Sequence, residues 1–192
     1  MIGSFRKEQG GVAAVEFALI LPVMITLFFG MVETTLALIC RADVSQMAST
    51  TADLISQVDT ASTADISNVY AAAGVILYPY YSGGTTGKPT IRITSIVYDG
   101  TSPLPASTGT VQWTCTQTGT GTLAPPARSK NDTVTLPKPL ITTATGSVIM
   151  AEVAYNYASP TTQTIVGSIN MSNNFYTKPR RVSQIPAPPS CP

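Results

Sequence analysis

The sequence has no histidine, so the commonest general base and the commonest metal ligand in proteins are both missing. Its three cysteines, Cys40, Cys115 and Cys191, do not have the spacing of a zinc site. There is no P-loop and no paired metal-binding motif, and the carboxylates of the second half are too sparse to suggest an active site. We therefore expect a protein that is not an enzyme and that has neither a cofactor nor a small-molecule substrate.

Charge is also scarce, since charged residues make up 11% of the chain and the formal net charge is +1. Basic residues are scattered apart from the short cluster Lys178-Pro-Arg-Arg181. Nucleic acid binding requires clustered Lys and Arg, so we expect no nucleic acid partner. Low charge combined with many Thr, Ser, Gly and Pro residues is typical of an exported surface protein.

A long apolar run lies near the N-terminus. The segment from Phe17 to Val32 carries no charge. A helix over residues 12–40 would be roughly 42 Å long at ~1.5 Å per residue, enough to cross a hydrocarbon core of about 30 Å. Arg6 and Lys7 precede this helix, so the positive-inside rule favours a cytoplasmic N-terminus and an exported remainder.

Other interpretations of this run fit the sequence less well. A secretory signal cut near Thr35-Leu-Ala37 fits poorly, and Ile39 is too large to precede a lipoprotein cysteine. A buried helix of a soluble domain is disfavoured by so apolar a run at a chain end. An ordinary, uncleaved membrane anchor remains the main alternative.

Glu16 is the unusual residue of this segment. A cut after Gly11 would remove a basic leader of residues 1–11 and make Val12 the first residue, Glu16 the fifth and Phe17 the sixth. This order resembles the prepilin pattern. The new α-amino group has an unperturbed pKa of ~8, so it is largely cationic at neutral pH. Its attraction to a carboxylate ~4 Å away, about 4 kcal/mol at an effective dielectric near 20, is comparable to the ~2.5–3.5 kcal/mol cost of a membrane-embedded acid. Pairing in an assembled bundle would therefore make Glu16 tolerable.

Pro22 lies inside the same run and removes one helix hydrogen bond, which frees the carbonyl of Ala18. Membrane helices tolerate this loss more readily than exposed ones. We expect a helix kink at Pro22. The kink is either a simple bend or one used when subunits leave the bilayer.

The next segment, residues 41–60, has no Gly or Pro and repeats apolar or small residues at spacings of three and four. This face consists of Val44, Met47, Ala48, Thr51, Leu54, Ile55 and Val58. The membrane helix is therefore predicted to continue as an amphipathic stalk that packs on a globular domain.

Residues 61–192 are predicted to form an exported α+β domain. Ser62-Thr-Ala-Asp65 is typical of a capping box that opens a second helix, which ends near Tyr78-Pro79. Alternating patterns then predict a small antiparallel sheet. Its expected strands lie within residues 88–100, 109–119, 146–160 and 173–185, whereas residues 164–172 fit either a helix or a strand. Residues 119–145 are predicted to be a long mobile loop and residues 186–192 a Pro-rich tail.

Cys115 and Cys191 both fall in the exported part, where an oxidising compartment permits a disulfide. A bond between them would tie the Pro-rich tail to a strand, and the alternative is two free thiols. We expect Cys40, at the membrane boundary, to be unpaired and packed along its helix.

A family resemblance unites these features. Residues 10–22 (GGVAAVEFALILP), Gly30-Met-Val-Glu33, Arg41 and Ala52-Asp-Leu-Ile55 look like TadE/TadG-like proteins of tight-adherence (Flp-type) pilus systems. The motifs WTC, AEVAYNY and FYTKPRR further along are similar but less distinctive. TadG-type relatives are often much longer and carry a von Willebrand A-like domain, whose metal-binding run is not found in this sequence. The TadE type is therefore favoured.

The resemblance implies a pilin-like minor pseudopilin of the inner membrane that helps to assemble an adhesive pilus. It implies cleavage by a prepilin peptidase after Gly11, a periplasmic C-terminal domain, and pilins, pseudopilins and pilus assembly proteins as partners. The location is then the inner membrane, or the pilus or cell surface after assembly. The alternative is an uncleaved, membrane-anchored exported domain that acts as a scaffold or in adhesion.

Overall fold

The computed structural model describes residues 10–81, 83–84, 87–159 and 167–192. The chain divides into two compact units, residues 1–38 and residues 39–192, which are described separately. Helix α1, Gly10–Ser56, contributes residues to both units. The expected leader falls mostly on residues 1–9, which lie outside the described residues.

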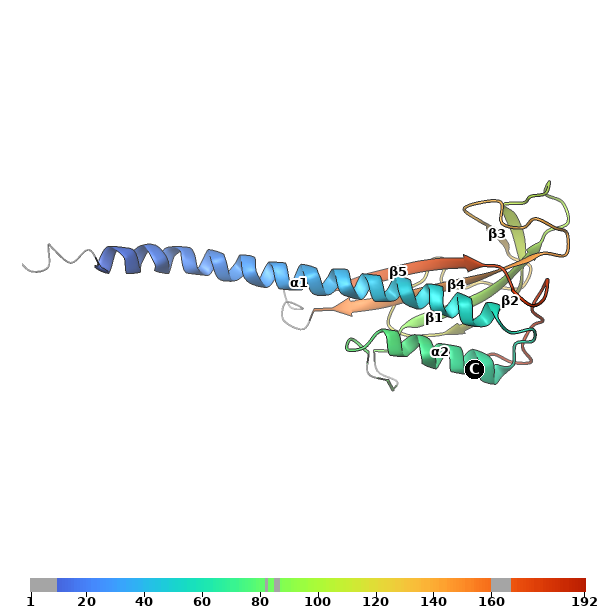
Figure 1. The fold of residues 1–192 in the computed structure, drawn as a ribbon, viewed down its shortest axis with the longest axis horizontal. Coiled ribbons are helices and arrows are strands. Elements are labelled where there is room, and N and C mark those ends of the chain that lie inside the picture. Colours follow the sequence, from blue (N-terminus) through green and yellow to red (C-terminus); the bar gives the residue numbers. More distant parts are fainter. Residues whose placement is uncertain (1–9, 82, 85–86, 160–166) are drawn as a thin grey trace, which may run out of the picture. The chain divides into compact units, whose positions relative to one another are not determined.

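The second unit is an α+β domain, as the sequence predicts, with a second helix and five strands (Figure 1). Its elements are α2 (Thr63–Ile76), β1 (Thr90–Tyr98), β2 (Thr108–Gln117), β3 (Thr133–Thr135), β4 (Ser147–Ala158) and β5 (Ser168–Thr177). The strands form one antiparallel sheet in the order β3-β2-β1-β4-β5. Its two edges are therefore the three-residue strand β3 and the ten-residue strand β5.

The end of α1 packs into this domain along the predicted face. Cys40 and the residues that follow at spacings of three and four are buried: Val44, Met47, Ala48, Thr51 and Ile55. Leu54 and Val58 of the predicted face are half-buried. Cys40 is a free, buried cysteine, as expected. The 3.6-residue period thus correctly identifies the side of the helix that contacts the domain.

The start of α2 also follows the sequence. The Ser62 side chain accepts a hydrogen bond from the backbone N–H of Asp65, and the Asp65 carboxylate accepts one from the backbone N–H of Ser62. This reciprocal capping box satisfies two N–H groups that have no partner within the helix. These hydrogen bonds lower the pKa of the Asp65 carboxyl.

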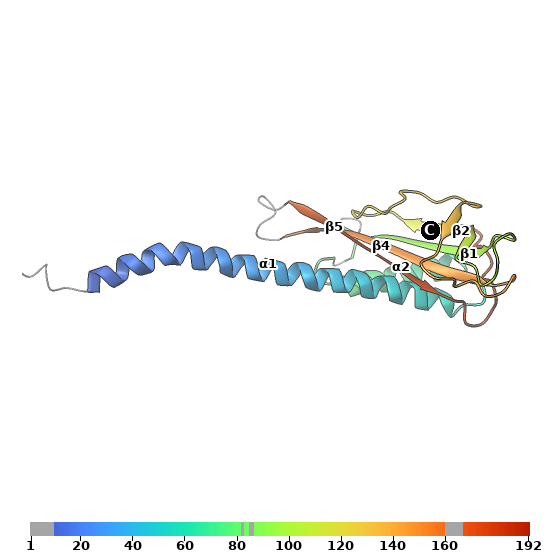
Figure 2. The same ribbon diagram turned by 90° about the horizontal axis from the view of Figure 1, so that it is seen from above.

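The sheet is covered on both faces, which the strand patterns do not predict. On one face lie α1 and α2 (Figures 1 and 2), and the Asn173 amide of β5 donates a hydrogen bond of 2.7 Å to the Ser45 hydroxyl of α1. The neighbouring strand position, Asn174, pairs with Glu152 and so shares the opposite face with it. There Glu152 contacts Arg128 of the segment 119–145. Because of this double cover, the first nine residues of β4 are all buried.

The segment 119–145, predicted to be a mobile loop, contains strand β3 and packs over the second face of the sheet. The backbone carbonyl of Gly121 accepts a hydrogen bond of 2.6 Å from the Thr90 hydroxyl, and that of Pro125 accepts one of 2.8 Å from Arg92. A cluster of buried apolar side chains joins this layer to the sheet: Ile96, Ala106, Val111, Val134, Leu136, Ile141, Val148 and Met150. Its Gly, Pro and Thr composition therefore does not prevent it from forming a packed layer.

The last strand begins and ends earlier than the sequence suggests. Residues 173–185 were expected to form the fourth long strand, but β5 covers Ser168–Thr177. The described part of the ambiguous segment, residues 168–172, is strand rather than helix. Pro179 follows the end of β5, in line with its inability to donate to a strand ladder.

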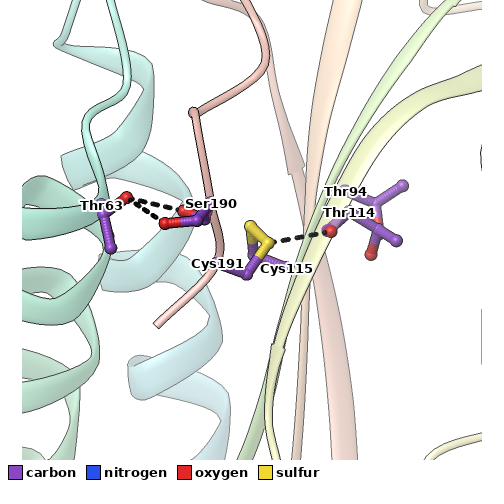
Figure 3. The surroundings of a disulfide bond; sticks show 6 residues. All are labelled: Thr63, Thr94, Thr114, Cys115, Ser190 and Cys191. Carbon is purple, nitrogen blue, oxygen red and sulfur yellow. Dashed lines mark hydrogen bonds between the residues drawn. A yellow bond between two sulfur atoms is a disulfide. The ribbon is translucent and has the colours of Figure 1, made fainter.

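The predicted disulfide between Cys115 and Cys191 is present, and it fastens the tail between the sheet and α2 (Figure 3). On the helix side, the Thr63 hydroxyl donates a hydrogen bond of 2.7 Å to the backbone carbonyl of Ser190. On the sheet side, the sulfur of Cys191 lies 3.3 Å from the carbonyl oxygen of Thr114. The C-terminal tail is thus attached to two elements that are far apart in the sequence.

Removing this disulfide should destabilise the domain. We expect Cys115→Ala with Cys191→Ala to lower the free energy of unfolding by roughly 2–4 kcal/mol, because the bond closes a long loop of the unfolded chain. Trp113, the only tryptophan of the chain, is buried and donates a hydrogen bond to the carbonyl of Ile185 in the segment leading to the tail. Its fluorescence during denaturant unfolding is the measurement, and an unchanged midpoint would contradict the stabilising role.

Candidate functional site

The residues singled out by the prepilin-like pattern lie in the first turns of α1. Gly11, Val12, Glu16 and Phe17 are all helical and exposed. Val12 and Glu16 are four residues apart, so they lie on the same face of the helix one turn apart. Helical side chains lean toward the N-terminus, so the Glu16 carboxylate is directed toward the turn that contains Val12.

This geometry suits a positive charge at Val12. The N-terminal end of a helix already carries a partial positive charge from its unpaired N–H groups, which favours a nearby carboxylate. A cut before Val12 would add a full positive charge about one turn from Glu16. Of the ion pairs formed within the described part of the chain, none includes Glu16.

Nothing in the fold requires a glycine at position 11. A Cβ added at Gly11 would meet no atom within 4 Å, and the residue does not have a positive φ angle. Neither close packing nor a left-handed backbone therefore requires glycine at this position. The reason for a glycine here is to be sought outside the folded chain.

The first unit presents an apolar surface on all sides of its helix. Its large hydrophobic side chains from Val12 to Val32 are 37–73% exposed, with Leu19 at 73% and Phe17 at 64%. In the described residues one helix, Gly11–Ser56, is long and apolar enough to cross a membrane. An all-round apolar helix of this length is typical of a membrane span rather than of an amphipathic surface helix.

The threonine hydroxyls within this apolar helix make hydrogen bonds inside the helix. The hydroxyls of Thr34 and Thr35 donate hydrogen bonds of 2.8 and 2.9 Å to the carbonyls of Gly30 and Met31. The Thr26 hydroxyl donates to the carbonyl of Pro22, and α1 continues as helix through Pro22. Such back-bonding removes the need for water at these side chains, as a hydrocarbon environment demands.

The second unit contains a buried charge cluster that sequence reasoning missed. Glu152 of β4 is 4% exposed and Arg92 of β1 is fully buried, and they lie opposite each other in the sheet. Arg92 Nε donates to Glu152 Oε2 at 2.7 Å, while Arg128 makes two hydrogen bonds of 3.0 Å to the same carboxylate. Burial raises the pKa of Glu152, but the hydrogen bonds and charges of the two arginines outweigh burial and hold the pKa below its usual value.

This cluster has a structural explanation. Arg92 belongs to the sheet and Arg128 to the covering segment, so the carboxylate between them joins the two layers. No group of three or more His, Cys, Asp or Glu residues able to hold a metal occurs in the described ranges. A Glu and an Arg at alternating positions of two apolar strands were the available signal, but their pairing depends on strand register.

One open cleft of about 450 Å³ lies along α2. It is lined by Ser67, Tyr70, Ala71, Gly74, Val75, Tyr78, Tyr81, Gly83 and Gln117. The described lining contains no carboxylate, amine, guanidinium or thiol, and its hydroxyl groups are those of Ser67, Tyr70, Tyr78 and Tyr81. The most specific site of the chain is therefore the start of α1.

Comparison with known proteins supports this emphasis. A family model described as TadE-like protein matches residues 11–53, which include the glycine, the acid and most of the helix. Neither a curated protein nor a solved structure matches the chain. The match thus rests on the part of the chain where the sequence pattern was most specific.

Proposed function

We propose a role in pilus assembly on the premise that this chain is a TadE-like protein of the TadE/TadG type, which the match of the TadE-like family model to residues 11–53 supports. The family indicates a membrane-anchored component of a tight-adherence (Tad) pilus system. The one helix of the described residues that is long and apolar enough to span a membrane would supply the anchor. More specifically, we propose a non-enzymatic minor pseudopilin of the TadE side.

The first specific element of the proposal is a cut after Gly11 by a prepilin peptidase. Supporting it, neither packing nor backbone conformation requires glycine at position 11, and recognition by the peptidase would supply a reason for it. The cut would leave Val12 as the first residue and Glu16 as the fifth. Phe17 would follow as an exposed aromatic side chain near the helix start.

The second element of the proposal is a role for Glu16 in assembly. The carboxylate lies one turn after Val12 and is exposed, so it can approach the new amine of its own chain or that of a neighbouring helix. An uncompensated acid in a bilayer costs about 2.5–3.5 kcal/mol, which gives each subunit a reason to find the amine. We propose that pairing with a neighbour's amine fixes the register of helices during assembly, with the expected bend at Pro22 available to the same helix.

The third element is orientation. Arg6 and Lys7 precede the apolar run and favour a cytoplasmic N-terminus. The Cys115–Cys191 disulfide in the second unit supports its export to an oxidising compartment, for which we propose the periplasm of a single-pass inner membrane protein. From there the domain would contact pilins and other assembly proteins and contribute to adhesion.

The alternative function is that of an uncleaved, anchored scaffold or adhesion domain. It is favoured by the length of the apolar helix, which spans a membrane with or without the leader. The two functions differ in one observable, the N-terminus of the mature chain.

Processing is tested by intact mass and N-terminal sequencing of the full chain produced with its own prepilin peptidase. We expect a mature chain that begins at Val12, and an unprocessed chain when the peptidase is catalytically inactive. Gly11→Leu should block processing without unfolding the domain, because nothing surrounds position 11 in the fold. A chain that keeps Met1 in the presence of active peptidase would overturn the cleavage and leave the scaffold function.

A further inference from the structure

The sheet of the second unit ends in a long edge strand without the usual protection. Strand β5 pairs with β4 over ten residues without a register shift, and no strand in the described part of the chain pairs with its other side. Proteins normally protect such edges with charges, prolines, bulges or very short strands. The sequence of β5, SINMSNNFYT, contains no charged residue and no proline. Most of its residues are exposed.

The opposite edge is closed. Strand β3 covers the start of β2, and Val111 then exchanges backbone hydrogen bonds with Asn131 and Asp132. Further along β2, Cys191 of the fastened tail lies against the carbonyl of Thr114 (Figure 3). The same sheet thus protects one edge with three separate features and leaves the other open.

The backbone groups that β5 presents outward can be assigned. The N–H of Asn174 donates a hydrogen bond of 2.9 Å to the side chain of Asn173 instead of to β4, so it points away from the ladder. Backbone direction alternates along a strand, so Asn170, Ser172 and Tyr176 also direct their N–H and C=O groups outward. The opposite edge of the sheet shows the same alternation. Across the sheet, Thr114 is aligned with Thr94, Met150 and Tyr176. Its carbonyl likewise points outward, toward the sulfur of Cys191.

We propose that the outer edge of β5 is a docking site for an extended, uncharged segment of a different exported protein, which adds to the sheet as an antiparallel strand. The inference rests on the proposed function, because it identifies the surface through which this pilus component meets a partner. Main-chain hydrogen bonds to Asn170, Ser172 and the carbonyl of Asn174 would hold the segment, since the Asn174 N–H already donates to the Asn173 side chain. Ile169 and Phe175 occupy alternate positions of the strand, and each is 43% exposed. Their side chains would contact apolar side chains of the docked segment.

The direction of β5 argues against a second copy as the occupant. Asn173 contacts Ser45, and the backbone N–H of Arg180 donates to the carbonyl of Ser56, so β5 runs in the same direction as the end of α1. Two copies joined by antiparallel β5 strands would point these helix ends in opposite directions. In both copies the N-terminal end of this helix segment directly follows the apolar span, which would lie in the same membrane, and the β2 edge of a neighbour is closed. An antiparallel partner strand is therefore expected to come from another kind of chain.

Ser172→Pro tests the site, because proline removes an outward N–H without removing a hydrogen bond to β4. In cells that make the pilus, we expect piliation to fall at least tenfold, whereas Ser172→Ala, which keeps the N–H, should pilate normally. The unfolding midpoint reported by Trp113 should be the same in both variants. Normal piliation of a folded Ser172→Pro chain would overturn the docking site.

Hydrogen exchange of the unmodified chain gives an independent answer should the proline variant fail to fold. In membranes that contain the other pilus proteins, amides of the peptide 168–177 should exchange at least tenfold more slowly than in the purified full chain. Unchanged exchange would overturn the proposal, and slowing in the purified chain at high concentration would assign the edge to a second copy. If the Glu16→Ala variant does not pilate whereas the Ser172→Pro variant does, the β5 docking site is wrong but the function in pilus assembly stands.

Discussion

Glu16→Ala is expected to abolish piliation while leaving processing after Gly11 intact. Removing the carboxylate removes an attraction of about 4 kcal/mol, before desolvation, to the amine of a neighbouring helix. A net loss of only ~2 kcal/mol per contact would weaken subunit association about 30-fold. The variant also inserts into the membrane more readily than the unmodified chain, because the cost of the embedded acid is gone. We therefore expect loss of assembly without loss of the membrane-inserted protein.

The measurements are intact mass for processing, membrane fractionation for insertion, and counts of pili by electron microscopy. Glu8→Ala is the matched control, because Glu8 lies in the leader and would be absent from the mature chain. It should pilate normally. Piliation of the Glu16→Ala strain at the level of the unmodified strain would remove the pairing role, whatever the N-terminus proves to be.

The second large effect is expected in the α+β domain, where Glu152→Leu should lower the free energy of unfolding by roughly 3–5 kcal/mol. The change leaves Arg92 fully buried with its charge uncompensated, and it detaches Arg128 of the covering segment. Denaturant unfolding of the full chain in detergent, followed by Trp113 fluorescence, is the measurement. A loss below ~1 kcal/mol would show that the segment 119–145 does not depend on this cluster.

A surface pair offers a matched comparison within the same domain. Asp53 pairs with Arg180 at the surface, with exposed side-chain fractions of 42% and 61%. Asp53→Asn should therefore cost less than about 1 kcal/mol, because solvent screens exposed pairs. Replacing Arg92, Glu152 and Arg128 together by apolar residues should restore much of the stability lost in Glu152→Leu, since no unpaired charge then remains.

The same cluster predicts the direction of the acid response. The pKa of Glu152 is held below its usual value in the folded domain, so the cluster contributes stability above the unfolded pKa of about 4.3. That contribution is lost as the pH falls through the lower folded pKa. Glu152→Leu should therefore abolish the part of acid destabilisation that the unmodified domain shows below about pH 4.

The local features of the chain were predictable because neighbouring residues determine them. The spacing of Val44, Met47 and Ile55 gave the buried face of α1, and Ser62 with Asp65 gave the start of α2. Two Cys residues in the part of the chain expected to be exported were enough to suggest a bond that the structure contains. The helix able to span a membrane was evident from its length and apolar composition alone.

The second layer over the sheet was not predictable in the same way. Gly, Pro and Thr residues in 119–145 indicate irregular backbone, and irregular backbone is usually mobile when it is exposed. Whether such a segment packs depends on what lies beneath it, here the apolar side chains of Ile96, Val148 and Met150. In the sequence Glu152 is likewise one of a few scattered carboxylates, because only strand register places it opposite Arg92.

The sequence by itself determined the helix able to span a membrane, the position of Glu16 relative to Gly11 and the α+β class of the second unit. Each depends on composition or on spacings of a few residues, and such spacings carry the periods of helices and strands. The tertiary structure alone decided which charges are buried together, that both faces of the sheet are covered, and that β5 rather than β2 is the open edge. These depend on contacts between residues far apart in the chain, whose pairing is set by the sum of many weak interactions rather than by any local pattern.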